Sequence, residues 1–256
     1  MELYQNGKRI VYVSQDNYCI VKSPDDVDTV YYCDSATSCI VLITTGLCNK
    51  TGTEVSVISH LSRPGRFDAY FNLVKQVFEG NLVKIYASGA NPPERYRKKT
   101  GDYDTTALRN ASQVIAWLAS KTMNIEQVCI KVGQGNPAVY NNNLDCYSIS
   151  FDSLKNASVS NARIYLTDKQ RDPTGGVQTL FCIYGDPEKI RNQYDDFTES
   201  EIQSLVGAAK NAGLDKAATM SDEQILENYS STPEFEVPWF CDSIRQAAKF
   251  VKNYKF

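Results

Sequence analysis

A cysteine and a histidine in this sequence have the types and spacing needed for nucleophilic chemistry. Cys39 opens the apolar run from Ile40 to Thr44, and His60 ends the alternating run that begins at Val55. A cysteine attacks as its thiolate, which a neighbouring imidazole can generate by taking the thiol proton. His60 is the only histidine in the chain, so any chemistry between a cysteine and an imidazole must use it.

The two runs are expected to form neighbouring strands of one sheet. If the strands pair antiparallel, the start of the first lies beside the end of the second, and Cys39 meets His60 at one edge of the sheet. The polar turn from Asp34 to Ser38 directly precedes the cysteine. Thr37 and Ser38 in this turn could contact a developing oxyanion through their backbone N–H groups. Asp34 could fix the tautomer of the imidazole, or simply cap the turn with its side chain.

The same residues also admit a purely structural interpretation. A cysteine at the start of an apolar strand is commonly a small buried hydrophobe, and a single histidine before a loop commonly has no catalytic role. Most of the other cysteines are expected to be core residues. Cys19, Cys129, Cys146 and Cys182 fall in predicted strands, Cys48 in a loop, and Cys241 in the first turn of the last helix.

Composition narrows the class of protein. The chain has 256 residues and a formal net charge of −3, with charges of both signs scattered along it, so nucleic acid and anionic membranes are not expected as partners. The N-terminal residues lack the apolar core of a signal peptide, and no run is long enough to span a bilayer. We therefore expect a monomeric protein of the cytoplasm, or of the cytoplasm and nucleus, with reduced thiols. With one histidine and no CxxC pair, neither a metal nor a cofactor is expected.

The pattern of apolar residues predicts strands first and helices later. Short strands are predicted through the first sixty residues, and further strands at 81–88, 127–132, 145–151, 162–166 and 177–183. Helices are predicted around 70–78 and over 105–121, the second with an apolar stripe of Leu108, Ala111, Ile115 and Leu118. Three helices close the chain. Capping boxes begin two of them, at Thr198 and Ser221, and the third begins near Pro238.

This order of elements favours a single α+β domain over residues 1–256. There is no regular alternation of strand and helix and no internal repeat. The expected architecture is a sandwich of mostly antiparallel sheet with flanking helices.

Several segments resemble the protein N-terminal asparagine amidohydrolases, a family of the wider Cys/His deamidase superfamily. The N-terminal segments are Tyr12–Gln15, Val21–Pro24, the Asp34-Ser35-Ala36-Thr37-Ser38-Cys39 turn and Ser59-His60. The C-terminal segments are Asp222–Pro233 and the helix with Ile244-Arg245 and Lys249-Phe250. The turn ending at Cys39 is similar to the family's Asp-Asp-Ala-Thr-Thr-Cys. After His60, Leu61-Ser62-Arg63 replaces the family's Cys-Asp-Gly.

The resemblance implies a deamidase-like fold and hydrolysis of the side-chain amide of an N-terminal asparagine, through a thioester, to aspartate and ammonia. It implies that Cys39 is the nucleophile and His60 its base. Residues before the cysteine, with Asp34 as the candidate third group, would complete the site. The implied partner is a peptide or protein with N-terminal asparagine. Two alternatives stay open: a glutamine deamidase or transglutaminase-like enzyme acting on internal side chains, and a catalytically silent binding module of the same fold.

Overall fold

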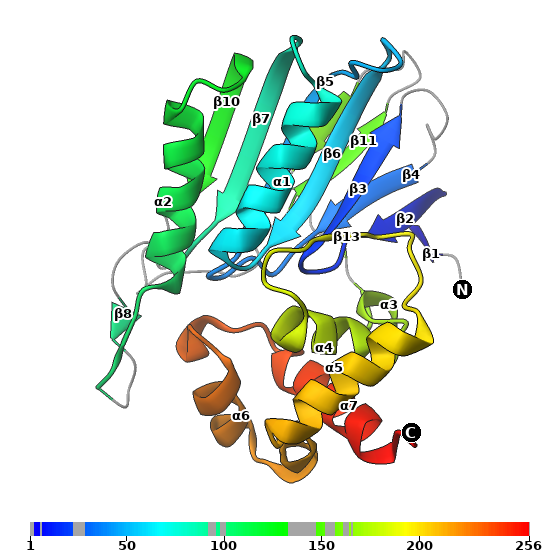
Figure 1. Cartoon of the computed structure of the whole chain (residues 1–256), viewed down its shortest axis with the longest axis vertical. Coiled ribbons are helices and arrows are strands. Elements are labelled where there is room, and N and C mark those ends of the chain that lie inside the picture. Colours follow the sequence, from blue (N-terminus) through cyan, green and yellow to red (C-terminus); the bar gives the residue numbers. More distant parts are fainter. Residues whose placement is uncertain are drawn as a thin grey trace.

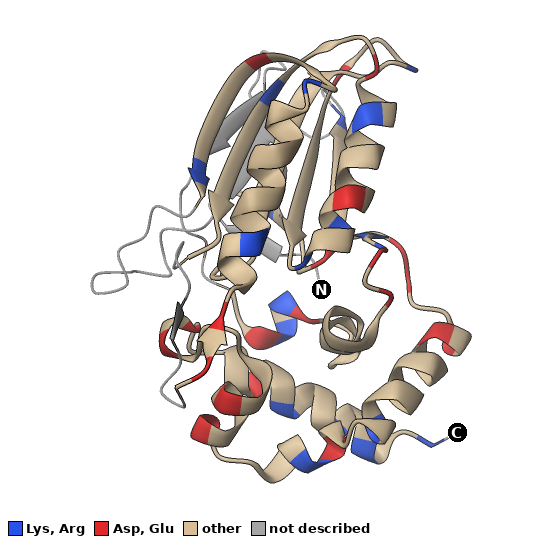
Figure 2. Ribbon diagram, turned by 60° about the vertical axis from the view of Figure 1, so that its left-hand side comes forward, with Lys and Arg blue, Asp and Glu red and all other residues tan. Residues whose placement is uncertain are grey.

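A computed structural model describes residues 3–5, 7–22, 29–91, 96–97, 101–132, 147–151, 157–160, 164 and 166–255. The described chain forms two stacked β-sheets with two helices on one side, and a group of helices below them that contains the C-terminus (Figure 1). Basic and acidic residues are interspersed over the sheets and the helices (Figure 2). Within the described helices no stretch is long and apolar enough to cross a membrane.

The larger sheet has six strands in the order β10-β7-β5-β6-β3-β13. Its central strands are antiparallel, and its two outermost pairs, β10 with β7 and β13 with β3, are parallel. The strands are β3 (Asn17–Lys22), β5 (Ile40–Leu47), β6 (Glu54–Leu61), β7 (Leu82–Gly89), β10 (Asn124–Val132) and β13 (Arg191–Asn192).

The second sheet has five strands in the order β1-β2-β4-β11-β12. All its pairs are antiparallel except β2 with β4. The strands are β1 (Leu3–Gln5), β2 (Lys8–Tyr12), β4 (Thr29–Cys33), β11 (Tyr147–Phe151) and β12 (Ala157–Ser160), and a separate pair joins β8 (Tyr96–Arg97) to β9 (Tyr103–Asp104). With the helices, this arrangement confirms the predicted α+β class and its mostly antiparallel sheets.

Helices α1 (Pro64–Val77) and α2 (Thr106–Ala119) cover the outer face of the six-stranded sheet (Figure 1). The apolar residues of β5 alternate between the two sides of this sheet. Ile40 and Leu42 pack in the core beneath the helices, whereas Cys39, Val41 and Ile43 belong to the core between the two sheets. This alternation, which follows from the period of two along a strand, directs Cys39 away from α1 and α2.

The C-terminal helices form a separate core below the sheets. They are α3 (Asp168–Arg171), α4 (Val177–Tyr184), α5 (Glu199–Asn211), α6 (Asp222–Tyr229) and α7 (Phe240–Asn253), with 3-10 turns η1 (Leu214–Thr219) and η2 (Pro233–Phe235). The capping boxes predicted at Thr198 and Ser221 are confirmed, since each hydroxyl accepts from the backbone N–H three residues on. This helical part and the sheets line one cavity together. The assignment of residues 1–256 to a single domain stays a prediction.

Three predicted elements need correction or fall outside the described residues. The strand predicted at 177–183 is wrong, because this segment is helix α4; the continuous apolar run within it, Leu180 to Ile183, is too short to have a period that separates a buried strand from a buried helix. The stripe on α2 is also partly wrong, since Leu108 and Ile115 are 42% and 57% exposed and the buried face consists of Ala107, Asn110, Ala111 and Val114. Most of the strand predicted at 162–166 lies outside the described residues.

Candidate active site

The strands that carry Cys39 and His60 pair as the sequence predicts. Strands β5 and β6 are antiparallel, with Val41 opposite His60. Cys39 lies two residues before Val41, so its side chain is on the same face of the sheet as His60 and diagonal to it. The start of β5 and the end of β6 lie at the end of the sheet that faces the C-terminal helices (Figure 1).

Cys39 and His60 both line a cavity of about 520 Å³ between the sheets and the C-terminal helices. One wall consists of residues from the sheets, the Cys39 turn and α2, and the other comes from α3, α4, the segment after α6 and the start of α7. Members of the first wall are Tyr12, Gln15, Ser38 and Asn110, and members of the second are Arg171, Gln178, Cys182, Ser231, Glu236 and Trp239. Residues far apart in the sequence therefore meet around the thiol.

The Cys39 thiol is held in its neutral form in this environment. Cys39 is 8% exposed, and burial raises the pKa of its thiol well above the usual value. Negative charge at Asp16 and Glu236 raises this pKa further, whereas Arg63 lowers it. Because desolvation penalises the thiolate, the resting side chain is a thiol that must lose its proton during attack.

His60 is also held neutral, and it is more deeply buried than Cys39. Burial lowers the pKa of its imidazole below 6.5, although the charges of Asp16 and Asp34 raise that pKa. Both ring nitrogens are buried, and neither hydrogen bonds to any of the described residues. A neutral imidazole with open nitrogens can accept a proton, as a general base must, and no hydrogen bond joins His60 to Cys39 in this structure.

Asp16 fixes the backbone at His60 and just after it, although its position in the sequence does not suggest this role. Its N–H donates to the carbonyl oxygen of His60 at 2.5 Å. Its carboxylate accepts from the N–H of Ser62 at 2.9 Å and from the hydroxyl of Ser62 at 2.8 Å. Asp16 adopts the left-handed region, with φ of 63°, which non-glycine residues seldom do. This geometry makes Asp16 a positioning residue for His60.

Arg66 completes this arrangement and links it to helix α4. It forms an ion pair with Asp16, and both side chains are fully buried. Its guanidinium also donates to the carbonyl oxygen of Phe181 at 3.0 Å and lies over the Phe181 ring at 4.8 Å. The last turn of a helix exposes carbonyl oxygens that favour a cation. One arginine therefore connects the His60 strand to the opposite wall of the cavity.

Asp34 lies near the site but contacts neither Cys39 nor His60 through a hydrogen bond. Its carboxylate accepts from Tyr12 at 3.0 Å, from Ser35 at 2.8 Å and from Arg171 at 2.5 Å. The Arg171 guanidinium stacks over the Trp239 ring at 3.8 Å. Asp34 thus both caps its turn, through Ser35, and holds an arginine that lines the cavity. On His60 it acts through its charge alone.

Thr37 and Ser38 form the turn that leads into β5, and their neighbours hold that turn in place. Thr37 N–H donates to Ser35 O at 3.0 Å, and Asn91 N–H donates to Thr37 O at 2.7 Å. The side chain of Asn110 donates to Ser38 O at 2.7 Å and to Ser62 O at 2.9 Å. Among the described residues, the N–H groups of Ser38 and Cys39 donate no hydrogen bond. They are therefore the donors nearest the thiol that could receive an oxyanion.

Gly89 allows a close approach that sets the position of Cys39. It has φ of 118°, and a Cβ added there would lie 2.2 Å from Cys39 O. The next residue, Ala90, donates its N–H to the same oxygen at 2.7 Å. Only glycine fits at this point, because both the backbone conformation and the space exclude a side chain.

The C-terminal segment after α6 contacts the cysteine turn directly. The Ser231 hydroxyl lies 2.8 Å from the Ser38 hydroxyl. On either side of Ser231, Ser230 and Thr232 donate to the carboxyl group of Glu236, at 2.5 and 3.4 Å. Neither this segment nor Glu236 could be assigned to the site from composition or spacing, since more than 190 residues separate Ser231 from Ser38.

Of the other cysteines, Cys182 also lies in the cavity, which corrects its assignment to a core strand. Its thiol donates to Gln15 O at 3.3 Å, and burial raises the pKa of this thiol far above its usual value. Cys48 is partly exposed, and hydrogen bonds from its loop, mainly Thr51, lower its pKa. Within the described residues no group of three or more His, Cys, Asp or Glu side chains could hold a metal ion.

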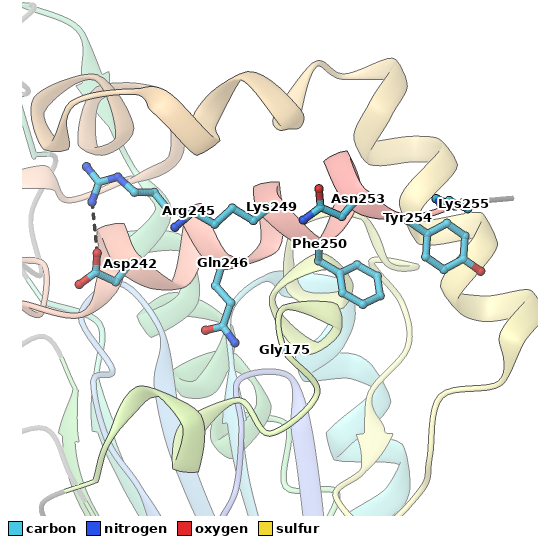
Figure 3. Close-up of a pocket in the computed structure, with 9 residues that line it drawn as sticks. All are labelled: Gly175, Asp242, Arg245, Gln246, Lys249, Phe250, Asn253, Tyr254 and Lys255. Atoms are coloured by element: carbon cyan, nitrogen blue, oxygen red, sulfur yellow. Dashed lines mark hydrogen bonds and ion pairs between the residues drawn. The ribbon is translucent and has the colours of Figure 1, made fainter.

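A second, more open hollow of about 750 Å³ lies along α7 near Gly175. Figure 3 shows the side chains of α7 that line it, with an ion pair between Arg245 and Asp242. Lys249 and Phe250 also line it. The described residues that line it include no thiol and no imidazole, so the chemistry of the chain is better placed in the cavity around Cys39.

Comparison with known families fits these observations. The family model for protein N-terminal asparagine amidohydrolase matches residues 101–256, which is more than half of the chain. The chain belongs to this family. Members are thus amidohydrolases that act on an N-terminal asparagine of a protein or peptide. No curated protein matches the chain.

The matched residues include the helical wall of the cavity, with Arg171, Glu236 and Trp239. Cys39 and His60 precede the matched region. Their assignment in this amidohydrolase therefore depends on their own geometry and on the resemblance of the segments around them.

Proposed function

We propose that this chain hydrolyses the side-chain amide of an N-terminal asparagine, with Cys39 as nucleophile and His60 as general base and acid. The observation that carries this proposal is the shared cavity. Cys39 and His60, which is the single histidine of the chain, lie on one face of the sheet and both line a cavity of about 520 Å³. That volume falls within the range of small-ligand sites, roughly 300–1,000 Å³.

The first step couples attack to proton transfer. Because Cys39 rests as a thiol and His60 as a neutral imidazole, the thiol proton moves to a ring nitrogen as sulfur attacks the amide carbon. The imidazole must come within hydrogen-bond reach of the thiol, a contact that often tightens only when substrate is bound. The negative charge of Asp16 favours the imidazolium that forms.

The second step releases ammonia. The amide oxygen becomes an oxyanion, which the N–H groups of Ser38 and Cys39 are placed to receive. The imidazolium of His60 gives its proton to the leaving nitrogen, the C–N bond breaks, and a thioester between Cys39 and the substrate side chain remains. Thr37 contributes to this step by holding in place the turn that carries Ser38 and Cys39.

The third step restores the enzyme. His60, neutral again, takes a proton from water as the water attacks the thioester carbon. The C–S bond breaks, the thiol regains its proton from His60, and the side chain leaves as the carboxylate of aspartate. One amide and one water give one carboxylate and one ammonium, so neither an oxidant nor a further reactant is required.

Asp34 serves this mechanism from a distance. Its charge raises the pKa of His60, and its ion pair fixes Arg171 on the cavity wall. We assign Asp34 as the third group of the site. Its negative charge, together with that of Asp16, stabilises the imidazolium of His60.

Short peptides test the proposal. Asn-first and Gln-first peptides, each with a free and an N-acetylated terminus, are incubated with the enzyme, and ammonia release is measured alongside the mass of the product. Conversion of the free Asn-first peptide alone is expected. Conversion of acetylated peptides, or of internal glutamine, would instead favour an enzyme that acts on internal side chains. Absence of any conversion would favour a silent binding module.

A further inference from the structure

A substrate recognised by its N-terminus carries an α-ammonium group, and the cavity must receive that positive charge near the reacting amide. Two carboxylate side chains of the described residues line the cavity, Asp172 and Glu236. Both oxygens of Asp172 are engaged at the entry to α4, one by Thr174 and the other by Thr179 at 3.2 Å. Asp172 therefore has a local role in shaping the helix.

Glu236 differs from Asp172 in its relation to the thiol. Its negative charge acts on Cys39, whereas Asp172 is not among the main charges that influence this thiol. The segment that carries Glu236 is anchored on the cysteine turn, because Ser231 contacts Ser38 while the flanking Ser230 and Thr232 hold the Glu236 carboxyl group. Glu236 is thereby positioned relative to Cys39 by a continuous set of contacts.

We propose that Glu236 receives the α-ammonium group of the substrate, and that this pairing removes the charge that opposes formation of the Cys39 thiolate. The inference rests on the function proposed above. In the free enzyme, a negative Glu236 disfavours negative charge on Cys39. An α-ammonium bound to Glu236 cancels this effect, so the correct substrate both binds and prepares the nucleophile.

The protonation of Glu236 gives the inference a pH signature. Burial raises the pKa of Glu236 to about 7, and hydrogen bonds from Ser230 and Thr232 lower it less strongly. The other ionisable side chains that line the same cavity are Tyr12, Cys39, His60, Arg63, Arg109, Arg171, Asp172, Cys182 and Tyr229, and the charge of Glu236 also acts on Cys241. Below pH 7 the carboxyl group is increasingly neutral, so capture of an ammonium weakens.

The test compares Glu236→Gln with Glu234→Gln, which makes the same chemical change two residues away on an exposed side chain. The substrates are an Asn-first peptide and its N-acetylated form. Loss of one partner of a buried charge pair costs roughly a hundredfold in affinity, so E236Q should lower kcat/KM for the free peptide by about that factor. E236Q should leave kcat/KM for the acetylated peptide unchanged, so that the variant no longer prefers the free peptide. E234Q should stay within about twofold of wild type, as surface changes usually do.

Two further readouts separate recognition from simple damage. The acidic limb of kcat/KM for the wild type should lie near pH 7 and should move below pH 6.5 in E236Q, where His60 then controls it. In the absence of peptide, iodoacetamide should modify Cys39 faster in E236Q than in wild type. Glu236→Asp keeps the negative charge on a shorter side chain and should recover part of the preference for the free peptide. Such recovery would show that the loss in E236Q comes from the missing charge and not from an unstable fold.

The outcomes distinguish the two proposals. If the wild type converts neither peptide, the proposed function fails and this inference fails with it. If the wild type prefers the free peptide but E236Q keeps that preference and its acidic limb near pH 7, the amidohydrolase function stands and the role of Glu236 is refuted.

Discussion

The backbone N–H of Asp16 donates to the carbonyl oxygen of His60, and the Asp16 carboxylate accepts from Ser62 two residues further along the chain. One residue thus holds the backbone at the candidate base and two residues after it. It also carries the charge that favours a protonated imidazole. Because Arg66 neutralises Asp16 and binds the last turn of α4, the geometry of His60 depends on contact between the two walls of the cavity.

Asp16→Asn should therefore lower both activity and stability. It leaves the buried Arg66 without its partner, which typically costs about 3–5 kcal/mol. The double variant Asp16→Asn with Arg66→Met removes both charges and should regain much of the thermal stability. If Asp16 also acts on His60, kcat stays reduced in the double variant even where Tm recovers. Full recovery of kcat together with Tm would show that the pair is only structural.

The pH dependence of kcat should report His60 in the enzyme–substrate complex. Burial lowers the pKa of His60 below 6.5, and a base must be unprotonated to act. We expect kcat to stay constant from neutral pH down to about 6.5, the usual value for histidine, and to fall only at lower pH. In Asp34→Asn the fall of kcat should occur at still lower pH, because the Asp34 charge raises the pKa of His60. A fall of kcat that begins above pH 7 in either protein would contradict the assignment of His60 as the base.

Gly89→Ala should displace the nucleophile. A Cβ at this position would lie 2.2 Å from the carbonyl oxygen of Cys39, and the backbone has φ of 118°. Gly52→Ala is a suitable control, since Gly52 also has positive φ but has no atom within 4 Å of an added Cβ. We expect G89A to lose most of its activity, and G52A to lose about 1 kcal/mol of stability while kcat is unchanged. Equal kcat in the two variants would argue against the close approach.

Alkylation of the free enzyme should not begin at the catalytic cysteine. Burial raises the pKa of Cys39 and leaves it 8% exposed, whereas Cys48 is partly exposed with a lowered pKa. Since iodoacetamide reacts with thiolates, peptide mapping at neutral pH should find Cys48 modified first, with activity retained. Cys48→Ala should remove this rapid phase. Faster modification of Cys39 than of Cys48 would mean that Cys39 rests as a thiolate.

The sequence predicts that Cys39 and His60 lie on one face of the sheet, because strand alternation and antiparallel pairing are local properties of β5 and β6. It does not reveal Asp16 or Arg66, whose importance arises from burial and from a contact with α4 that no local pattern records. The sequence places Cys182 in a strand, because the short apolar run from Leu180 to Ile183 fits a strand and a helix equally well. Glu236 belongs to the C-terminal segment that carries the family resemblance, but its position beside Cys39 depends on the packing of that segment against the cysteine turn.

The central claim is that Cys39 forms the thioester, and a pair of matched substitutions tests it most directly. Cys39→Ser and Cys182→Ser each change a buried thiol of the same cavity to a hydroxyl. Ammonia release from a free Asn-first peptide should fall by roughly a thousandfold or more in C39S, as for loss of other catalytic nucleophiles. C182S, which can still donate to Gln15, should stay within about tenfold of wild type, the effect of about 1.4 kcal/mol. Full activity in C39S would contradict the account.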